Sequence, residues 1–245
     1  LIDITDPLDT SPGYISLNNY SISDYKNHGV LKAYEIITNS SQVGASKIAL
    51  MLGADNIVTT YKEFGFSKPI NINFPSPTFG QINNRENMSD IEIANLGFGY
   101  GLDASPFQIA SAFAVFANEG VYKEFSLVMN DEYMYEKQVI SKETADKILF
   151  ALRDVIENGS GRKAKVPGFD IGGKTGTSHK SVKGGGYAKS IYTASFAGIA
   201  PLESKDLTIF VSIYQPGLNA YTGGEIAAPL FAEIGSDTLN YLGYF

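Results

Sequence analysis

The order of hydrophobic patterns along this 245-residue chain predicts an α+β fold. Helical spacing of apolar residues dominates residues 40–160, whereas aliphatic residues stand at every second position over residues 207–214. A second helical pattern closes the chain. Helices that precede a run of strands joined by short connections are typical of an antiparallel sheet, not of a doubly wound parallel one. We therefore expect an antiparallel sheet covered by helices, together with a helical subdomain.

The first 39 residues predict an irregular lead-in that contains short strands. Pieces such as Tyr14–Leu17 lie between proline and asparagine turn signals and show no helical period. We expect the whole chain to form a single domain with three parts. They are the lead-in (1–39), a helical subdomain (40–160) and a final part with antiparallel strands and a C-terminal helix (161–245).

Caps and glycine stops bound the helices expected in the subdomain. These helices begin near residues 40, 55, 105 and 141, and they end before Gly53, Gly65, Gly120 and Gly159. Residues 66–100 carry scattered prolines and asparagines, so we expect them to be irregular. After Gly159 the period changes to that of strands. The expected strands are 169–178, 191–199 and 207–214, joined by loops at 179–190 and 201–206. The expected closing helix runs from about residue 224 to residue 242.

The composition narrows the classes of function. Acidic residues outnumber basic ones by 26 to 19, so the formal net charge is −7 and non-specific nucleic-acid binding is disfavoured. The chain has no cysteine, which excludes disulfides and thiolate sites, and its two histidines, His28 and His179, are too few for a histidine-rich metal centre. We expect both histidines to face solvent. No apolar run approaches the roughly 18 residues of a membrane-spanning helix.

Residues 168–175 match the phosphate-loop pattern G-x-x-x-x-G-K-T. A phosphate loop needs a helix directly after its Lys-Thr pair, because phosphates bind the N–H groups at the start of that helix. Lys174 and Thr175 are instead followed by Gly-Thr-Ser and by a glycine cluster at 184–186, without any helical pattern. We therefore favour an edge strand, whose small residues suit docking of an extended peptide. The alternative is a surface strand with incidental Lys and Thr residues.

Several segments together resemble a known family. Lys-Thr-Gly at 174–176 is one of three motifs of the serine acyl-transferases that react with penicillin. The segments GGKTGTSHK, YTASFAGIAP and GGEIAAPLFAEI resemble the C-terminal half of class B penicillin-binding proteins, the bacterial peptidoglycan transpeptidases. Upstream, SSQVGASKIAL resembles the family's second motif, Ser-x-Asn, and GFGYGLDASPFQIASAFAVFANEG resembles the stretch that follows it. The SSQVGASK and YTASFAGIAP forms are most similar to the septal, division-specific members.

The resemblance implies a penicillin-binding, β-lactamase-like fold and a serine-type D-Ala-D-Ala transpeptidase. In this chemistry a serine attacks a D-alanyl-D-alanine carbonyl, and an amine of a neighbouring stem peptide then takes the acyl group. Ser40 matches the serine of the second motif, where its hydroxyl would relay a proton. The alternative is that Ser40 or Ser41 caps a helix. Gln42 stands where the family has asparagine, and either amide can hydrogen-bond the substrate backbone.

The resemblance also assigns roles along the Lys-Thr-Gly strand. Lys174 would place a positive charge opposite the terminal carboxylate of the substrate, and the hydroxyls of Thr175 and Thr177 would bind that carboxylate. The backbone N–H of Thr177 would form half of the oxyanion hole. Gly176 would leave room for the acyl carbonyl. The alternative for Lys174 is a solvated lysine that protects an edge strand from aggregation.

The family's nucleophile motif, Ser-x-x-Lys, has two formal matches, at residues 23–26 and 160–163. Both lie in polar or glycine-rich segments that offer no apolar face to bury, so we reject them. By the resemblance, the nucleophile is expected to precede Leu1, and residues 1–245 are expected to be part of a transpeptidase domain. Two alternatives stay open: a non-catalytic scaffold of the division machinery that kept the fold, and a related D,D-carboxypeptidase or β-lactamase.

The resemblance further implies partners and a location. Peptidoglycan stem peptides and β-lactam antibiotics would be the ligands, and cell-division proteins and a lipid-linked glycan polymerase would be the protein partners. No nucleic acid, metal or nucleotide cofactor is expected. The domain would lie on the periplasmic side of the bacterial inner membrane, anchored by an N-terminal helix outside this chain.

Overall fold

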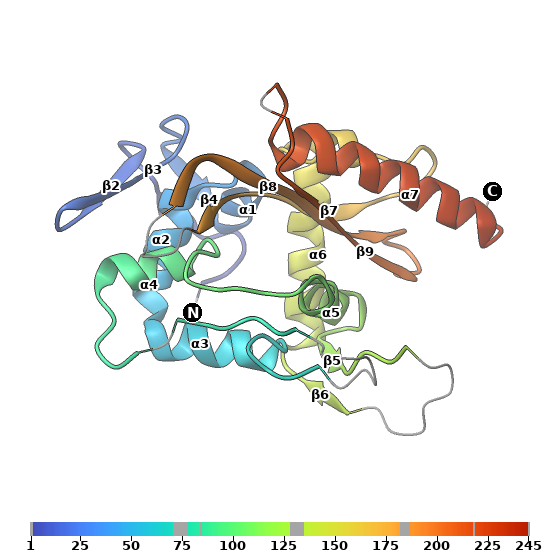
Figure 1. The fold of residues 1–245 in the computed structure, drawn as a ribbon, viewed down its shortest axis with the longest axis horizontal. Helices are drawn as coiled ribbons and strands as arrows, with labels where there is room; N and C mark the ends of the chain where they lie inside the picture. Colours follow the sequence, from blue (N-terminus) through green and yellow to red (C-terminus); the bar gives the residue numbers. More distant parts are fainter. Residues whose placement is uncertain are drawn as a thin grey trace.

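A three-stranded sheet lies between two groups of helices (Figure 1). The structure is a computed structural model that describes residues 2–70, 78–83, 85–127, 135–181, 187–217 and 219–244. Its helices are α1 (Ala33–Asn39), α2 (Gln42–Leu52), α3 (Ala54–Glu63), α4 (Asp90–Leu96), α5 (Pro106–Ala117), α6 (Lys142–Glu157) and α7 (Ala228–Tyr241), with the short segments η1 (Arg162–Ala164) and η2 (Gly223–Ala227). Its strands are β1 (Pro7–Asp9), β2 (Tyr14–Leu17), β3 (Tyr20–Ser23), β4 (Val30–Lys32), β5 (Val121–Lys123), β6 (Glu136–Gln138), β7 (Gly172–Ser181), β8 (Tyr187–Ala200) and β9 (Leu207–Tyr214).

The sheet is the antiparallel meander that the sequence predicts. Its strand order is β7-β8-β9, so β7 lies at one edge. Thr175 pairs with Phe196 on β8, and Ala194 pairs in turn with Ile213 on β9. Strands β7 and β8 both extend into the segment expected as a loop, 179–190; residues 182–186 of that loop lie outside the described residues. The segment that matches a phosphate loop therefore enters an extended strand, not a helix.

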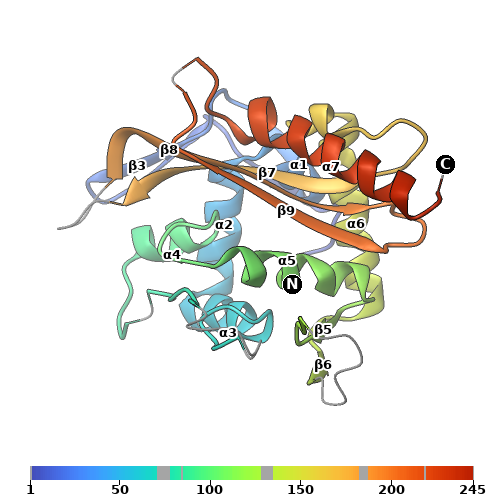
Figure 2. The same cartoon turned by 45° about the vertical axis from the view of Figure 1, so that its right-hand side comes forward.

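Helix α7 covers one face of the sheet, and α5 lies on the opposite face, as the turned view shows (Figure 2). The core beneath α7 forms around the rings of Phe196 on β8 and Phe231 on α7, whose centroids are 4.7 Å apart. Both side chains are fully buried. Gly173 on β7 has no side chain because a Cβ there would lie 2.5 Å from the Phe196 ring. This core fixes β7 against the rest of the sheet.

The caps that the sequence predicts are present at three helices. Ser41, Ser105 and Ser141 each accept a hydrogen bond from a backbone N–H in the first turn of α2, α5 and α6, respectively. These bonds satisfy donors that a helix start leaves unpaired.

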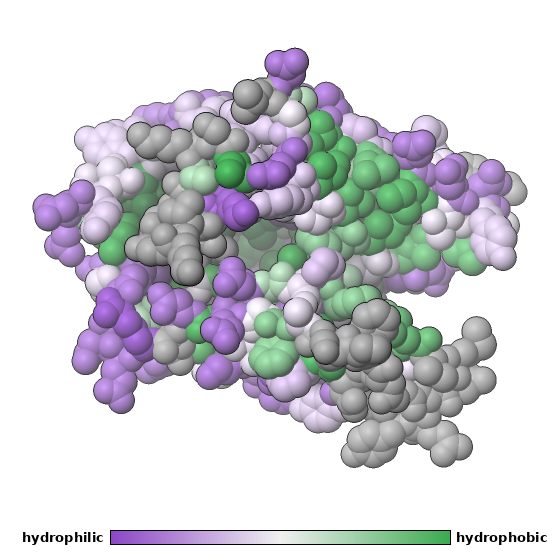
Figure 3. All heavy atoms as spheres, viewed as in Figure 1, coloured by the Kyte–Doolittle hydropathy of each residue, from purple (hydrophilic) through white to green (hydrophobic). Residues whose placement is uncertain are grey.

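On the face of the molecule shown in Figure 3, hydrophobic residues gather over α7, where Leu230 and Ile234 are partly exposed.

Two short helices were not expected from the sequence. The lead-in 1–39, expected to be irregular or β, contains α1, and residues 66–100, expected to be irregular, contain α4. Each is seven residues long, which is too short to show a clear hydrophobic period or to be stable alone. Tertiary contacts stabilise them instead: Thr38 of α1 donates a hydrogen bond to Asp154 of α6 at 2.7 Å. Residues 71–77 and 84 lie outside the described residues.

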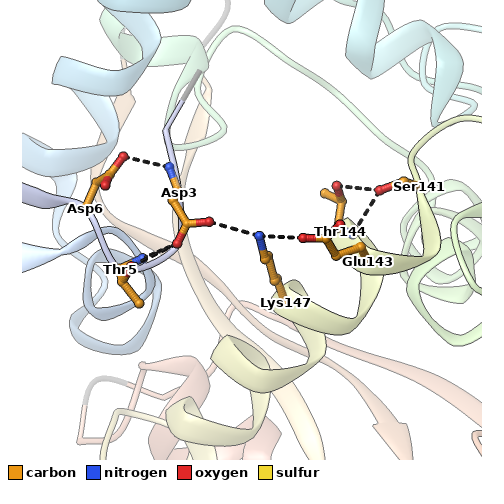
Figure 4. Close-up of polar contacts among 7 residues, drawn as sticks. All are labelled: Asp3, Thr5, Asp6, Ser141, Glu143, Thr144 and Lys147. Carbon is orange, nitrogen blue, oxygen red and sulfur yellow. Dashed lines mark hydrogen bonds and ion pairs between the residues drawn. The ribbon is translucent and has the colours of Figure 1, made fainter.

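The start of the lead-in is held against the first turns of α6 (Figure 4). Asp3 forms an ion pair with Lys147 at 2.9 Å, and Lys147 also pairs with Glu143 at 2.9 Å. The backbone N–H and the hydroxyl of Thr5 donate to the same Asp3 carboxylate. The hydrogen bonds from Lys147 and Thr5 lower the pKa of Asp3 to about 2. Residues 3–6 are thereby joined to the helical part of the fold.

Candidate active site

Ser40 lies at the junction of α1 and α2 in a left-handed backbone conformation, with φ 54° and ψ 41°. Such a conformation is uncommon for a residue other than glycine and is found more often at functional sites. Ser41, not Ser40, caps α2, because its Oγ accepts a hydrogen bond from the N–H of Gly44 at 2.9 Å. The Ser40 hydroxyl is therefore available for another contact. It accepts a hydrogen bond from Nζ of Lys174 at 2.5 Å.

Asp24 holds the start of α2 in place, a role that no local pattern in the sequence indicates. One of its carboxylate oxygens accepts a hydrogen bond from the Ser41 hydroxyl at 2.6 Å, and the other accepts one from the N–H of Val43 at 3.1 Å. A carboxylate at a helix N-terminus is also favoured by the helix dipole. The formal nucleophile match at 23–26 surrounds this aspartate; in the described structure Ser23 and Lys26 are exposed and share no hydrogen bond.

Lys174 reaches from the edge strand β7 to this junction. Besides Ser40, its ammonium group donates to the backbone oxygen of Thr175 at 3.2 Å and to the Thr175 hydroxyl at 3.5 Å. None of the ion pairs in the described part of the chain involves Lys174. Burial lowers the pKa of Lys174 to about 8, so the group is still mostly cationic at pH 7. A half-buried cation without a paired carboxylate is suited to attract an anionic ligand.

Thr175 contacts Ser160, which belongs to the rejected formal match at residues 160–163. Its Oγ1 lies 2.6 Å from Oγ of Ser160, which follows the C-terminal end of α6. The intervening residues include η1, which contains Lys163, the lysine of the formal match at 160–163. Among the described residues Lys163 makes no hydrogen bond to Ser160. The structure therefore places the Ser160 hydroxyl beside the Lys-Thr-Gly strand without a lysine partner.

Thr177 contacts the start of the closing helical segment. Its Oγ1 accepts a hydrogen bond from the N–H of Gly223 at 3.0 Å. A Cβ at Gly223 would lie 2.3 Å from the backbone oxygen of Ser195 and 2.4 Å from that of Gly176, so only glycine fits here. The segment η2 that begins at Gly223 is a π-helical turn, a feature found frequently at functional sites. Glycines are common at turns, so the local sequence carries no signal of this contact.

Gly176 and Gln42 have no direct contact with the Lys174 ammonium group in the described structure. A Cβ at Gly176 would lie 2.5 Å from Oγ of Ser195 on β8, so the missing side chain makes room for a neighbouring strand's hydroxyl. Gln42 is the first residue of α2, two residues after Ser40, and its side chain is exposed. This side chain forms no hydrogen bond with another described residue. The roles in substrate binding expected for these two residues stay predictions.

An aromatic cluster lies at the far end of β7 and β8. The ring of His179 lies 4.6 Å from that of Tyr192, which stacks on Tyr221 at 4.4 Å. Nδ1 of His179 lies 3.1 Å from the backbone oxygen of Ala188. His179 is therefore partly buried against β8 and is not the solvent-facing residue that we expected. The described residues hold no group of three or more side chains that could bind a metal ion.

Lys174 thus contacts both Ser40 and Thr175, although Ser40 and Lys174 are 134 residues apart in the chain. The sequence matches the family described as penicillin binding protein transpeptidase domain over residues 2–236. The chain belongs to this family. Its transpeptidase fold superposes on the apo TP domain from Burkholderia pseudomallei penicillin-binding protein 3 with a TM-score of 0.92. That alignment has 31% sequence identity and covers 99% of this chain and 74% of the other.

Two curated relatives of this transpeptidase domain are named as peptidoglycan D,D-transpeptidases. The probable enzyme PbpC from Pseudomonas aeruginosa is 32% identical over 241 residues, which is 98% of this chain and 42% of that protein. FtsI from Buchnera aphidicola subsp. Schizaphis graminum is 32% identical over 228 residues, which is 93% of this chain and 40% of that protein. The chain spans less than half the length of these relatives.

The predicted α+β, penicillin-binding fold is confirmed. Within the described ranges, no helix has both the length and the apolar character needed to cross a bilayer.

Proposed function

We propose that this chain supplies most of the acyl-transfer site of a peptidoglycan D,D-transpeptidase, which cross-links stem peptides during cell-wall synthesis at the division septum. The observation that carries the proposal is the contact between Nζ of Lys174 and Oγ of Ser40 at 2.5 Å. It joins the Lys-Thr-Gly motif to the serine of the second motif within a domain of the transpeptidase family. Two relatives named as D,D-transpeptidases support the same reaction.

The reaction proceeds by two acyl transfers. A serine oxygen attacks the D-Ala-D-Ala carbonyl, the C–O ester bond forms, the C–N bond breaks, and the released D-alanine takes the serine proton. The amine of a second stem peptide then attacks the ester carbonyl, a C–N bond forms, the C–O ester bond breaks, and the serine oxygen takes the proton that the amine loses. By the family resemblance we place the nucleophilic serine outside residues 1–245. Ser40 relays protons between the nucleophile and the amine.

The remaining predicted residues bind the substrate. Lys174 and the hydroxyls of Thr175 and Thr177 hold the terminal carboxylate, while the extended peptide pairs with the edge of β7. The backbone N–H of Thr177 stabilises the oxyanion, and losing one such donor typically slows the reaction by about 10²–10³. Gln42 hydrogen-bonds the peptide backbone in place of the family's asparagine, and Gly176 leaves space for the acyl carbonyl.

The wider setting follows from the same family assignment and is part of the proposal. The ligands are peptidoglycan stem peptides and β-lactams, which imitate D-Ala-D-Ala. Cell-division proteins and a lipid-linked glycan polymerase are the proposed partners. The domain is proposed to work on the periplasmic side of the inner membrane, anchored by a helix outside residues 1–245.

Thr175→Val in the full-length protein tests this function. Valine keeps the shape of threonine but removes the hydroxyl that faces the substrate carboxylate. We expect acylation by fluorescent penicillin to slow by about tenfold, as for one lost hydrogen bond to a charged group, with little change in melting temperature. Failure of the wild-type protein to be acylated would contradict the transpeptidase proposal and favour the non-catalytic scaffold. A melting-temperature increase with ATP and magnesium would instead revive the phosphate-loop interpretation.

A further inference from the structure

We infer that Ser160 is a positioning residue that directs the hydroxyl proton of Thr175 toward the bound carboxylate. The inference rests on the proposed function, because it concerns the same carboxylate site. It starts from the 2.6 Å separation between Oγ of Ser160 and Oγ1 of Thr175. None of the three motifs of the family's chemistry includes Ser160, which belongs only to the rejected formal Ser-x-x-Lys match at residues 160–163.

The backbone around Ser160 is fixed from two sides. The N–H groups of Gly159 and Gly161 donate to the backbone oxygen of Val155, at 3.1 and 3.0 Å, so the turn after α6 is closed by hydrogen bonds. From the other side Gly224 of η2 approaches so closely that a Cβ there would lie 2.6 Å from the backbone oxygen of Ser160. The backbone of this turn therefore fixes the position from which the Ser160 hydroxyl contacts Thr175, although the Ser160 side chain is exposed.

The count of donors and acceptors decides the direction of the hydrogen bonds. The Thr175 hydroxyl has one proton and two lone pairs. Lys174 can only donate, and its Nζ lies 3.5 Å from Oγ1 of Thr175. If Thr175 donated its proton to Ser160, it would have none left for an anionic oxygen. A bound carboxylate therefore selects the arrangement in which Ser160 donates to Thr175 and Thr175 donates to the carboxylate.

This chain of bonds strengthens carboxylate binding. A hydroxyl that accepts hydrogen bonds from two donors is polarised and becomes a better donor itself. Water can replace an exposed serine in part, so the effect is smaller than that of removing Thr175. Loss of one such bond corresponds to a decrease of about three- to tenfold in the acylation rate.

The experiment compares variants of the full-length protein. Ser160→Ala is the test, and Ser160→Thr is the conservative rescue, because it keeps a hydroxyl. Ser16→Ala, at an exposed position on strand β2, is the matched control. The readouts are the acylation rate with benzylpenicillin, the rate with its methyl ester, which lacks the anionic carboxylate, and the melting temperature. We expect Ser160→Ala to slow acylation by the free acid about three- to tenfold. The rate with the ester and the melting temperature should stay unchanged, and Ser160→Thr and Ser16→Ala should resemble the wild type.

Three outcomes would overturn the inference while leaving the transpeptidase function standing. They are a wild-type rate for Ser160→Ala, an equal slowing with acid and ester, and a lowered melting temperature with unchanged acylation of the folded protein. If label maps to Ser160 itself, the residue is a nucleophile and the positioning role is wrong. If the wild-type protein is not acylated at all, the proposed function fails, and the inference fails with it.

Discussion

Ser40 and Ser41 are adjacent in the chain, yet their hydroxyls have different partners. Ser41 is almost fully buried, caps α2 and donates to Asp24 at 2.6 Å, whereas Ser40 is exposed and accepts from Lys174. The left-handed backbone at Ser40 separates the two side chains in this way. The sequence left the helix cap undecided between them, because either serine stands where a cap is common.

This division of roles predicts opposite outcomes for two alanine variants of the full-length protein. Ser40→Ala should slow β-lactam acylation by about a hundredfold, as expected for a lost proton relay, with the melting temperature nearly unchanged. Ser41→Ala should lower the free energy of unfolding by about 1–2 kcal/mol through the lost cap, with acylation of the folded protein largely retained. Measuring both quantities on both variants is the test. A stability loss at Ser40 with normal acylation would show that the second motif is structural here.

The charge of Lys174 predicts a pH dependence. Burial lowers its pKa to about 8, below the ordinary value near 10.4. The ammonium form that attracts a carboxylate is therefore present below pH 8 and is lost as the pH rises through 8. We expect acylation to fall by up to about tenfold for each pH unit above 8. Lys174→Arg keeps its charge throughout this range and should react more slowly at pH 7 but without the alkaline fall. A rate that rises through pH 8 would instead indicate a neutral lysine acting as a base.

The same lowered pKa has a consequence for folding. Between about pH 8 and 10.4 the unfolded chain binds more protons at Lys174 than the folded chain does. The contribution of this lysine to the free energy of unfolding therefore increases with pH across that window. Desolvating the cation costs stability at neutral pH, which is a common property of residues kept for binding.

Among the elements of the fold, segment η2 holds strand β7 in position. The N–H of Gly223 bonds the Thr177 hydroxyl, and the backbone of Gly223 lies against Gly176 and Ser195. Gly223→Ala would force this segment away from the sheet, because backbone atoms cannot move aside as a flexible side chain can. We expect a loss of about 1–3 kcal/mol in the free energy of unfolding and slower acylation. Gly217→Ala is the matched control, since no atom lies within 4 Å of a Cβ there. Equal effects of the two substitutions would contradict the proposed close packing.

The elements that could be predicted from the sequence are those with long patterns or explicit caps. Helices α2, α5 and α6 each begin after a capping serine, and the alternation in β9 marks the sheet. Helices α1 and α4 could not be predicted, because seven residues hold less than two full periods. Their stability comes from contacts with distant parts of the chain, which a local pattern does not contain.

Within the candidate site, too, local sequence patterns mark some residues, whereas others depend on contacts with distant parts of the chain. The motifs single out Ser40 and Lys174 in the sequence, and the structure brings these two side chains into contact, while their catalytic roles stay predictions. Asp24, Ser160 and Gly223 could not be identified in this way, since each acts through a partner 15 to 46 residues away in the chain. Their residue types are common at turns, so they carry no local signal of the contacts that they make.

For the molecule as a whole, the site depends on two parts of the fold meeting. Ser40 belongs to the helical part, and Lys174, Thr175 and Thr177 belong to the sheet. The residues between them form the helices that hold both parts in place. The Asp3–Lys147 ion pair additionally joins the lead-in to α6 of the helical part. The proposed transpeptidase therefore needs the complete arrangement of both parts, not an isolated motif.

The most direct test of the central claim is to label the full-length protein with a fluorescent penicillin and to map the acylated residue by mass spectrometry. We predict a single acylated serine that lies outside residues 1–245, and acylation at that serine should be strongly slowed by Lys174→Ala. The 245-residue chain alone should remain unlabelled. Absence of label on the full-length protein, or label on Ser23 or Ser160, would contradict the account.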